Sequence, residues 1–360
     1  MEKCKGKTID QLKLKKFLVV QTAFIGDVIL TLPLVQLIRE NILDAHIDFL
    51  TISRSAEVLK NHPDINSVII YEKHNEDKGI EGFKRILKTL KQKNYDIAIV
   101  PHRSFRSALL VYSAGIPIRI GFDRSAGRFL FTDIIQYQYS IHEIERNISL
   151  LKTLFEIPVD TKVYPKLYPD ISDIKRVEKI LAEQNIQHDN KFICVAPGSV
   201  WNTKRWTKEG YIELIAKLIK KDYIIFLVGS RSDFELCDFI CKCVNNSKVI
   251  NVSGELSILQ SAELIRQSVL LISNDSAPVH IATAVGTPVI ALFGPTTPRF
   301  GFYPYRERSR VIEVNGLKCK PCRIHGSRKC PTGKFECMTG ITHEVIIKEV
   351  EAIAGKFEKV

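Results

Sequence analysis

The chain of 360 residues is 45% hydrophobic and carries a formal net charge of +12 at pH 7. Its length fits two domains better than one, and the lack of a long apolar run or a signal-peptide pattern argues against a membrane-spanning or secreted protein, so we expect a soluble cytoplasmic one. The excess of positive charge points to an anionic partner, a class that includes nucleic acid, an anionic membrane surface and a phosphorylated small substrate.

The opening MEKCKGKTIDQLKLKK contains six lysines and two acids, and we interpret residues 1–15 as a solvated basic tail. From Lys16 the chain alternates short β-rich runs with helical patterns. The run KFLVV, a turn ending in Gly26 and a helical pattern over 27–40 come first. AHIDFLTI, INSVIIY and DIAIVPH follow, with helical stretches between them. This alternation predicts a parallel sheet with helices on both faces over residues 16–160.

A polar, proline-bearing stretch interrupts the alternation, and we interpret residues 161–173 as a linker. The alternation restarts over 174–345, with helices predicted at 208–220, 232–244 and 257–267, and a C-terminal helix follows over 346–360. The predicted fold class is α/β, with two successive Rossmann-like parallel-sheet domains. Ligands are expected in a cleft that both domains face, at the carboxyl ends of their strands.

Three familiar phosphate-binding motifs are absent from the sequence. There is no G-x-G-x-x-G dinucleotide fingerprint, no G-x-x-x-x-G-K-[ST] P-loop and no D-x-D pair of aspartates that could clamp Mg²⁺ on a diphosphate. A ligand phosphate would then be held by helix ends and basic side chains, and the sequence gives no reason to require a metal.

The first candidate site is TAFIGDVILTLP, residues 22–33. Gly26 makes a tight turn from strand to helix, and Asp27 falls at the helix start. An aspartate there can simply cap the helix, because it is favoured by the helix dipole. It can also act as a general base toward an attacking hydroxyl within hydrogen-bonding reach. Both interpretations stay open at this point.

An arginine-rich stretch, residues 101–128, is the second candidate. It contains five arginines, no lysine and one acid. Arginine binds phosphate and carboxylate with two parallel hydrogen bonds, whereas lysine acts as a point charge. The stretch is therefore a candidate for binding an acidic substrate, although its composition also suits a nucleic-acid patch.

Strand-to-helix loops in the second half supply two more candidates. In APGSVWNTKRW, residues 196–206, Lys204 lies between two tryptophans and could neutralise charge on a leaving phosphate, or it could belong to an ordinary surface loop. In NDSAPVHIATAVGTP, residues 274–288, Pro278 suits the first turn of a helix. The helix N-terminus is an anion site, with His280 one turn further on, unless the acid and hydroxyl only cap the helix.

Cysteines are concentrated near the C-terminus. Nine are present in a chain without a signal peptide, which favours reduced thiols over disulfides. Four of them have the spacing C-x2-C-x7-C-x6-C, with a histidine inside: Cys319, Cys322, Cys330 and Cys337. This spacing resembles a structural zinc knot, but the second pair is stretched, and we favour a reduced cluster that packs a loop.

Together these motifs resemble the ADP-heptose:lipopolysaccharide heptosyltransferases, glycosyltransferase family 9. The resemblance rests on IGDVILTLP, HEIERNISLL, VAPGSVWNTKRWTKEGY and NDSAPVHIATAVGTPVIALFGPT, and it runs from about Lys16 to about Ala354. The segment CKPC…CPTGKFECM is similar to one in many members of the heptosyltransferase II type. The resemblance implies a two-domain GT-B fold and inverting, metal-independent transfer of heptose from ADP-heptose to Kdo or heptose of the lipopolysaccharide inner core.

The resemblance also implies roles for individual residues. Asp27 matches the catalytic base and Lys204 the lysine that stabilises the leaving diphosphate. The implied donor-binding residues are Gly198, Ser199, Thr203, Lys204, Asp233, Asp275, Ser276, Ala277 and His280. Glu235 is an alternative to Asp233 as the acid that contacts the donor ribose. The implied acceptor-binding residues are Gly26, Arg106, Arg124, Arg128 and Arg146.

No cofactor is expected beyond the donor substrate, and the acceptor is expected at the cytoplasmic face of the inner membrane. One alternative keeps the GT-B fold but uses another nucleotide sugar or acceptor. A second is a zinc-stabilised nucleic-acid binding protein, suggested by the charge and the four cysteines. Stacking aromatics interleaved with basic residues are lacking, which argues against nucleic acid as a partner.

Overall fold

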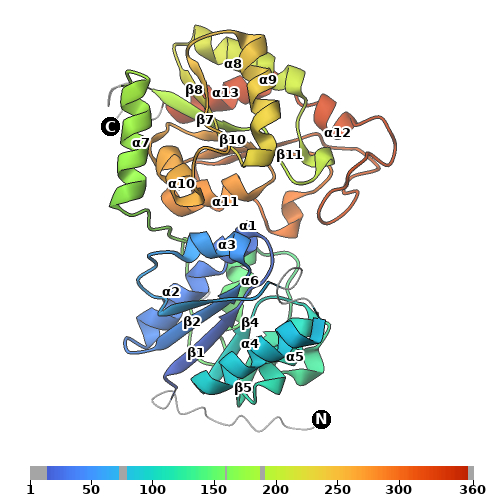
Figure 1. The fold of residues 1–360 in the computed structure, drawn as a ribbon. Helices are drawn as coiled ribbons and strands as arrows, with labels where there is room; N and C mark the ends of the chain where they lie inside the picture. Colours follow the sequence, from blue (N-terminus) through green and yellow to red (C-terminus); the bar gives the residue numbers. More distant parts are fainter. Residues whose placement is uncertain (1–13, 73–78, 159, 187–190, 356–360) are drawn as a thin grey trace. The chain divides into compact units, whose positions relative to one another are not determined.

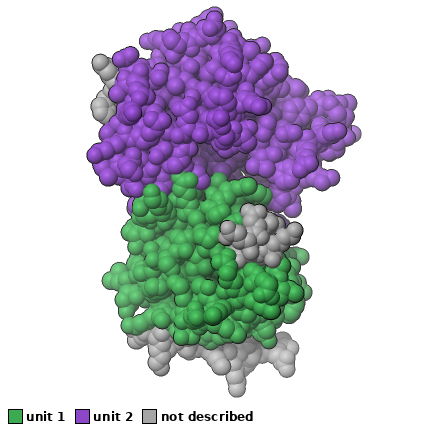
Figure 2. Space-filling view, viewed as in Figure 1, with its two compact units in different colours: residues 1–138, 143–163 green, residues 139–142, 164–360 purple. Residues whose placement is uncertain are grey.

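The computed structural model describes residues 14–72, 79–158, 160–186 and 191–355, drawn as a ribbon in Figure 1. Most of the predicted basic tail therefore lies outside the described residues. The chain divides into two compact units, coloured green and purple in Figure 2. Unit 1 comprises residues 1–138 and 143–163, and unit 2 comprises residues 139–142 and 164–360.

Unit 1 contains six parallel strands in the order β3-β2-β1-β4-β5-β6. Their bounds are β1 Lys16–Val20, β2 His46–Thr51, β3 Ser67–Ile70, β4 Ile97–Val100, β5 Ile118–Phe122 and β6 Asp133–Ile135. The first strand is central, since Phe17 pairs with Ile47 on one side and with Ile97 on the other. Every residue of β1 after Lys16 is fully buried, as expected for a parallel strand covered on both faces.

The helices of unit 1 are α1 Ile25–Ile29, α2 Leu32–Asn41, α3 Ser53–Ala56, α4 Gly79–Lys93, α5 Phe105–Ser113 and α6 Glu143–Ser149. The single helix predicted over 27–40 is wrong, because the structure has two helices there. Pro33 lies in the first turn of α2, where a proline ring is tolerated. Within one continuous helix the same ring would clash with the preceding turn.

Unit 2 repeats this architecture with strands in the order β12-β11-β10-β7-β8-β9, again all parallel. Their bounds are β7 Phe192–Ala196, β8 Ile224–Leu227, β9 Val249–Asn251, β10 Leu271–Asn274, β11 Val289–Phe293 and β12 Arg310–Glu313. Counted from the first strand of each unit, the two orders are the same. The predicted pair of Rossmann-like parallel-sheet domains is confirmed.

The helices of unit 2 are α7 Ile171–Glu183, α8 Lys208–Lys220, α9 Phe234–Val244, α10 Ile258–Gln267, α11 Ala277–Val285, α12 Glu336–Thr339 and α13 His343–Ala354. Helix α8 has the bounds that the sequence predicts. Helix α7 begins inside the predicted linker, because the Asp170 carboxylate caps the N–H groups of Ser172 and Asp173. None of the helices in the described part of the chain is long and apolar enough to cross a bilayer.

Candidate functional site

Each sheet has one point where the chain order reverses between neighbouring strands. In unit 1 this point lies between β1 and β4, and in unit 2 between β7 and β10. Ligands of doubly wound folds bind outside the carboxyl ends of the strands at such a point. The four candidate stretches follow these four strands: 22–33 after β1, 101–128 after β4, 196–206 after β7 and 274–288 after β10. The topology therefore places the candidates of each unit on neighbouring loops.

In unit 2 the structure joins Lys204 to Asp275. The Lys204 ammonium lies 2.6 Å from Oδ2 of Asp275 and 3.1 Å from its main-chain oxygen. The Thr296 hydroxyl donates to the same Oδ2 at 2.6 Å. The two charged side chains are only 13% and 8% exposed, so the pair is largely shielded from water. A cation and a carboxylate that the sequence places 71 residues apart meet at the reversal point of the sheet.

His280 lies one turn into α11 and is buried, with 5% of its surface exposed. Among the described residues its Nδ1 atom has no hydrogen-bond partner. Burial lowers the pKa of His280 to about 4; the Asp275 carboxylate opposes this shift and the Lys204 ammonium adds to it. The imidazole is therefore neutral at pH 7. It can offer a hydrogen bond to a ligand but not a positive charge.

The start of α11 has the form expected of an anion site. Ser276 precedes the helix in an extended conformation, and its hydroxyl donates to the Asn274 carbonyl at 3.2 Å instead of capping the helix. Pro278 lies in the first turn, as predicted. The first N–H groups of a helix have no acceptor within the helix, so those of Ser276 and Ala277 are suited to a phosphate.

Asn274 is a site residue that the sequence analysis did not single out. Its amide donates to the carbonyl of Pro197 at 2.8 Å, and its carbonyl accepts from the Trp206 N–H at 2.9 Å and the Tyr211 hydroxyl at 3.1 Å. It thereby fixes the loop after β7 to the end of β10. The available signal was an asparagine directly after the apolar run VLLIS. The structure shows it fully buried, where a polar side chain needs hydrogen-bond partners.

Asp233 reaches the loop after β7 from the other side. A Cβ atom added at Gly198 would lie 2.1 Å from Oδ1 of Asp233, so only glycine leaves room for this carboxylate. The other carboxylate oxygen accepts from the Ser230 N–H at 2.9 Å, and Arg205 lies 4.0 Å from Oδ1. Glu235, the alternative acid, is exposed in the first turn of α9. Of the two acids, Asp233 is the one that lies against the loop after β7, and its contact with a donor ribose stays a prediction.

The two remaining donor candidates of this loop are occupied by protein partners. Ser199 is buried, and its main-chain oxygen accepts from the Arg205 side chain at 2.8 Å. The Thr203 hydroxyl donates to the main-chain oxygen of Ser327 at 2.8 Å and accepts from its N–H at 2.8 Å. Thr203 thus contacts the cysteine-rich segment, and its direct contact with a donor stays a prediction.

In unit 1 the Asp27 side chain is half-buried, and its Oδ2 accepts from the Phe24 N–H at 3.1 Å. The capping contact considered for this aspartate is therefore present. Gly26, the preceding residue, is buried. The Asp27 carboxylate also lies close enough to Glu143 to raise the pKa of that second carboxyl. A capping bond to one oxygen does not prevent a half-exposed carboxylate from accepting a proton.

Arg146 is 1% exposed and its guanidinium is surrounded by protein partners. It donates to the Gln138 carbonyl and to the Tyr137 hydroxyl, both at 2.7 Å, and to the Glu143 carboxylate. Burial raises the pKa of Glu143 to about 7; Arg146 opposes the shift and Asp27 adds to it. The structure thus places Arg146 in a buried network. Its contact with the acceptor substrate stays a prediction. Glu143 was missed, although Glu and Arg three positions apart on a helix predict a pair.

The other predicted acceptor arginines follow the carboxyl ends of β4 and β5. Arg106 is half-buried, with its guanidinium carbon 5.9 Å from the centre of the Tyr71 ring. Arg124 and Arg128 are exposed. Arg103, which was not among the predicted site residues, lies over the Tyr137 ring at 4.4 Å. The structure therefore gathers exposed or half-buried arginine side chains at one edge of the sheet.

The four clustered cysteines are free thiols, of which Cys337 is buried and the others half-buried. Within the described ranges no group of three or more His, Cys, Asp or Glu side chains has the arrangement of a metal site. The reduced cluster that we favour stays a prediction, with a structural zinc as its alternative.

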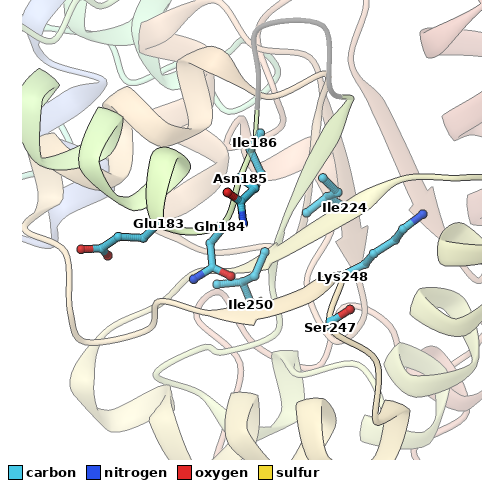
Figure 3. Close-up of a pocket in the computed structure, with 8 residues that line it drawn as sticks. All are labelled: Glu183, Gln184, Asn185, Ile186, Ile224, Ser247, Lys248 and Ile250. Carbon is cyan, nitrogen blue, oxygen red and sulfur yellow. The ribbon is translucent and has the colours of Figure 1, made fainter.

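A pocket of about 310 Å³ lies in unit 2. Figure 3 shows its lining side chains, which include Glu183 at the end of α7, Ile224 at the start of β8 and Lys248 just before β9. In a parallel sheet these positions lie at the amino ends of the strands. The pocket is therefore at the opposite edge from Lys204 and Asp275, and we assign it no part in the candidate site.

Comparison with known proteins gives the following similarities. The model of glycosyltransferase family 9 (heptosyltransferase) matches residues 83–332. The chain is 27% identical to lipopolysaccharide heptosyltransferase 2 of Escherichia coli K12, covering 94% of this chain and 98% of the relative.

Solved structures agree with these sequence similarities. The crystal structure of a family 9 glycosyltransferase from Veillonella parvula has a TM-score of 0.85 at 22% identity, covering 95% of this chain and 98% of the other. The E. coli ADP-heptose lps heptosyltransferase II has a TM-score of 0.77 at 25% identity, covering 95% and 99%. The predicted GT-B fold is confirmed by these matches.

Proposed function

We infer the reaction of this chain from the fact that it belongs to glycosyltransferase family 9, the heptosyltransferase family. It is a glycosyltransferase. We propose that it transfers heptose from ADP-heptose to Kdo or heptose of the lipopolysaccharide inner core, with inversion at the anomeric carbon and without a metal. The observation that carries the proposal is the shielded Lys204–Asp275 pair beside the N-terminus of α11.

On this proposal the unit 2 residues bind the donor. The first N–H groups of α11 and the Lys204 ammonium bind the diphosphate, because both supply positive potential. The neutral His280 adds a hydrogen bond. When a phosphate competes for Lys204, the Asp275 carboxylate accepts hydrogen bonds from sugar hydroxyls. A carboxylate repels phosphate but is a good hydrogen-bond acceptor. Asp233 contacts the donor ribose.

Transfer then follows a single displacement. Asp27 takes the proton from the acceptor hydroxyl, whose oxygen forms the new bond to the anomeric carbon of heptose. The bond from that carbon to the diphosphate oxygen breaks, and ADP leaves with the electron pair. Lys204 stabilises the charge that develops on the diphosphate. Attack from the face opposite the leaving group inverts the anomeric configuration.

The test is an in vitro transfer assay with ADP-heptose and defined Kdo-lipid acceptors, read by mass spectrometry, with the product anomer determined by NMR. We expect transfer to persist in EDTA. Stabilisation by a UDP-sugar alone in a thermal-shift panel would instead support the alternative of another nucleotide sugar. Loss of transfer in EDTA, or a retained anomeric configuration, would contradict the proposed mechanism.

We predict that Asp27→Ala lowers kcat at least about 100-fold, because general-base catalysis contributes about 10² to 10⁴. ADP affinity should stay nearly unchanged, since the donor residues lie in unit 2. Asp27→Asn, which keeps the side-chain shape, serves as the matched variant and should be equally slow. Normal turnover in either variant means that Asp27 is not the base.

A further inference from the structure

We propose that the cysteine-rich segment, residues 319–338, is a positioning strap that holds Lys204 in place for transfer, and that Thr203 is the positioning residue that joins the strap to the lysine. This proposal rests on the role of Lys204 in the proposed function. It assigns a purpose to a segment whose cysteine pattern the reaction does not otherwise use.

The first observation is a set of three hydrogen bonds between Thr203 and Ser327. The Thr203 N–H donates to the Ser327 carbonyl at 3.1 Å. The Thr203 hydroxyl donates to the same carbonyl at 2.8 Å and accepts from the Ser327 N–H at 2.8 Å. Thr203 is buried, and it directly precedes Lys204. The strap thus fixes the main chain and side chain of the residue next to the lysine.

Close packing of the strap against the lysine stem is the second observation. Gly326 has a φ of +80°, and a Cβ atom added there would lie 3.1 Å from Cγ of Lys204 and 3.3 Å from Oγ1 of Thr203. Such a distance is tighter than ordinary van der Waals contact. A glycine at position 326 therefore allows both the left-handed backbone conformation and the close approach to the Lys204 side chain.

The strap is also anchored at the far side of the Lys204–Asp275 pair. The Cys322 N–H donates to the Pro295 carbonyl at 2.8 Å, one residue before the threonine that donates to Asp275. Lys320 is nearly buried, and its ammonium donates to the Phe293 carbonyl at 3.2 Å. The strap consequently connects the end of β11 with the loop after β7.

This connection matters because a lysine ammonium ends a flexible four-carbon stem. Its place relative to the diphosphate depends on the main chain from which the stem starts. Misplacement of a catalytic group by about 1 Å can cost about 100-fold in rate. Weakening the strap should therefore lower kcat, with a smaller change in the KM for the donor.

The first test compares Thr203→Val with Thr203→Ser. Valine keeps the shape but removes both hydroxyl hydrogen bonds, whereas serine keeps them. We expect kcat to fall about tenfold in Thr203→Val and to be restored in Thr203→Ser, with Tm recorded for both. Equal kcat in Thr203→Val and wild type would overturn the proposal.

The second test leaves the threonine in place and compares Gly326→Ala with Gly333→Ala. Both glycines lie in the strap with positive φ, at +80° and +72°, but a Cβ at Gly333 meets nothing within 4 Å. Both variants carry similar backbone strain, and only the Cβ atom of Gly326→Ala presses on Lys204 and Thr203. We expect kcat to fall in Gly326→Ala alone. An equal fall in both variants would overturn the proposal.

Turnover of Lys204→Ala and of Thr203→Val/Lys204→Ala separates failure of this proposal from failure of the proposed function. If the strap acts through Lys204, adding Thr203→Val to Lys204→Ala lowers kcat no further. A further fall of the same size as in wild type would overturn the strap while leaving Lys204 in its role. Normal turnover in Lys204→Ala would instead overturn the role of Lys204 itself, and the strap with it.

Discussion

Water reaches little of the Lys204 and Asp275 side chains. Each charge therefore depends on the other for compensation. Breaking a shielded pair by removing one partner leaves an uncompensated charge, which is costly. Removing either partner should therefore lower stability as well as activity. Activity loss in either single variant must consequently be compared with its stability.

We predict that Lys204→Met lowers the free energy of unfolding by about 3 kcal/mol, since it leaves the Asp275 carboxylate without its cation. Asp275→Asn should relieve that cost. The loss of unfolding free energy in Lys204→Met/Asp275→Asn should therefore be about 1 to 3 kcal/mol smaller than the summed losses of the two single variants. Urea unfolding of the four proteins measures this coupling. Additive effects would mean that the two charges do not stabilise each other.

His280 makes stability depend on pH. Burial lowers its pKa to about 4 from the ordinary 6.5. Between these two values the unfolded chain binds a proton that the folded chain does not. The contribution of His280 is therefore fully present above pH 6.5 and is lost as pH falls toward 4.

We predict that wild type loses on the order of 3 kcal/mol more unfolding free energy than His280→Gln between pH 7 and pH 4. Glutamine is neutral throughout this range, so it serves as the reference. Urea unfolding at several pH values gives the two curves. Parallel curves would show that the imidazole is not held neutral by its surroundings.

At the scale of elements, the side chain of Asn274 holds the loop after β7 against the end of strand β10. We predict that Asn274→Ala lowers the free energy of unfolding by about 3 kcal/mol, because it leaves the Trp206 N–H and the Pro197 carbonyl without this partner. Asn202→Ala changes an exposed residue of the same loop and should cost far less. Similar Tm values for both variants would argue against a linking role of Asn274.

Periodicity in the sequence predicts most elements well. Helix α8 has its predicted bounds of Lys208–Lys220, because Thr207 caps its start and the apolar spacing continues to its end. The split between α1 and α2 was missed, although Pro33 was visible in the sequence, because the apolar pattern runs on through the break. The local apolar pattern predicts that these residues are helical, but a single proline decides whether the helix is continuous.

At the scale of the whole molecule, the donor candidates all lie in unit 2 and the proposed base in unit 1. We predict that ADP slows hydrogen exchange in peptides that cover 196–206 and 274–285, because its phosphates bind the N–H groups of those loops. Peptides of β1 and α1 should change little. Hydrogen-exchange mass spectrometry with and without ADP measures the effect, and unchanged exchange in both peptides would contradict the proposed donor site.

The fold class and the four candidate loops could be predicted because each depends on residues close together in the sequence. The pairings within the site could not. The partners of Lys204 and Thr203 lie 71 and 124 positions away, and no local pattern reports such a contact. The burial of Arg146 against Glu143 and Tyr137 could not be predicted either, since the exposure of this side chain depends on the packing of the whole unit.

The separation of Thr203 from Ser327 has a consequence for biosynthesis. A ribosome delivers the lysine loop long before it delivers the residues that hold it, and domains fold as units while the chain emerges. The nascent protein therefore contains all six strands of its second sheet, β7 to β12, while the loop is still unsupported. Catalytic competence should appear only once translation has passed position 338. Ribosome-stalled chains that end before the strap also lack the core residues of α13, and they should be inactive.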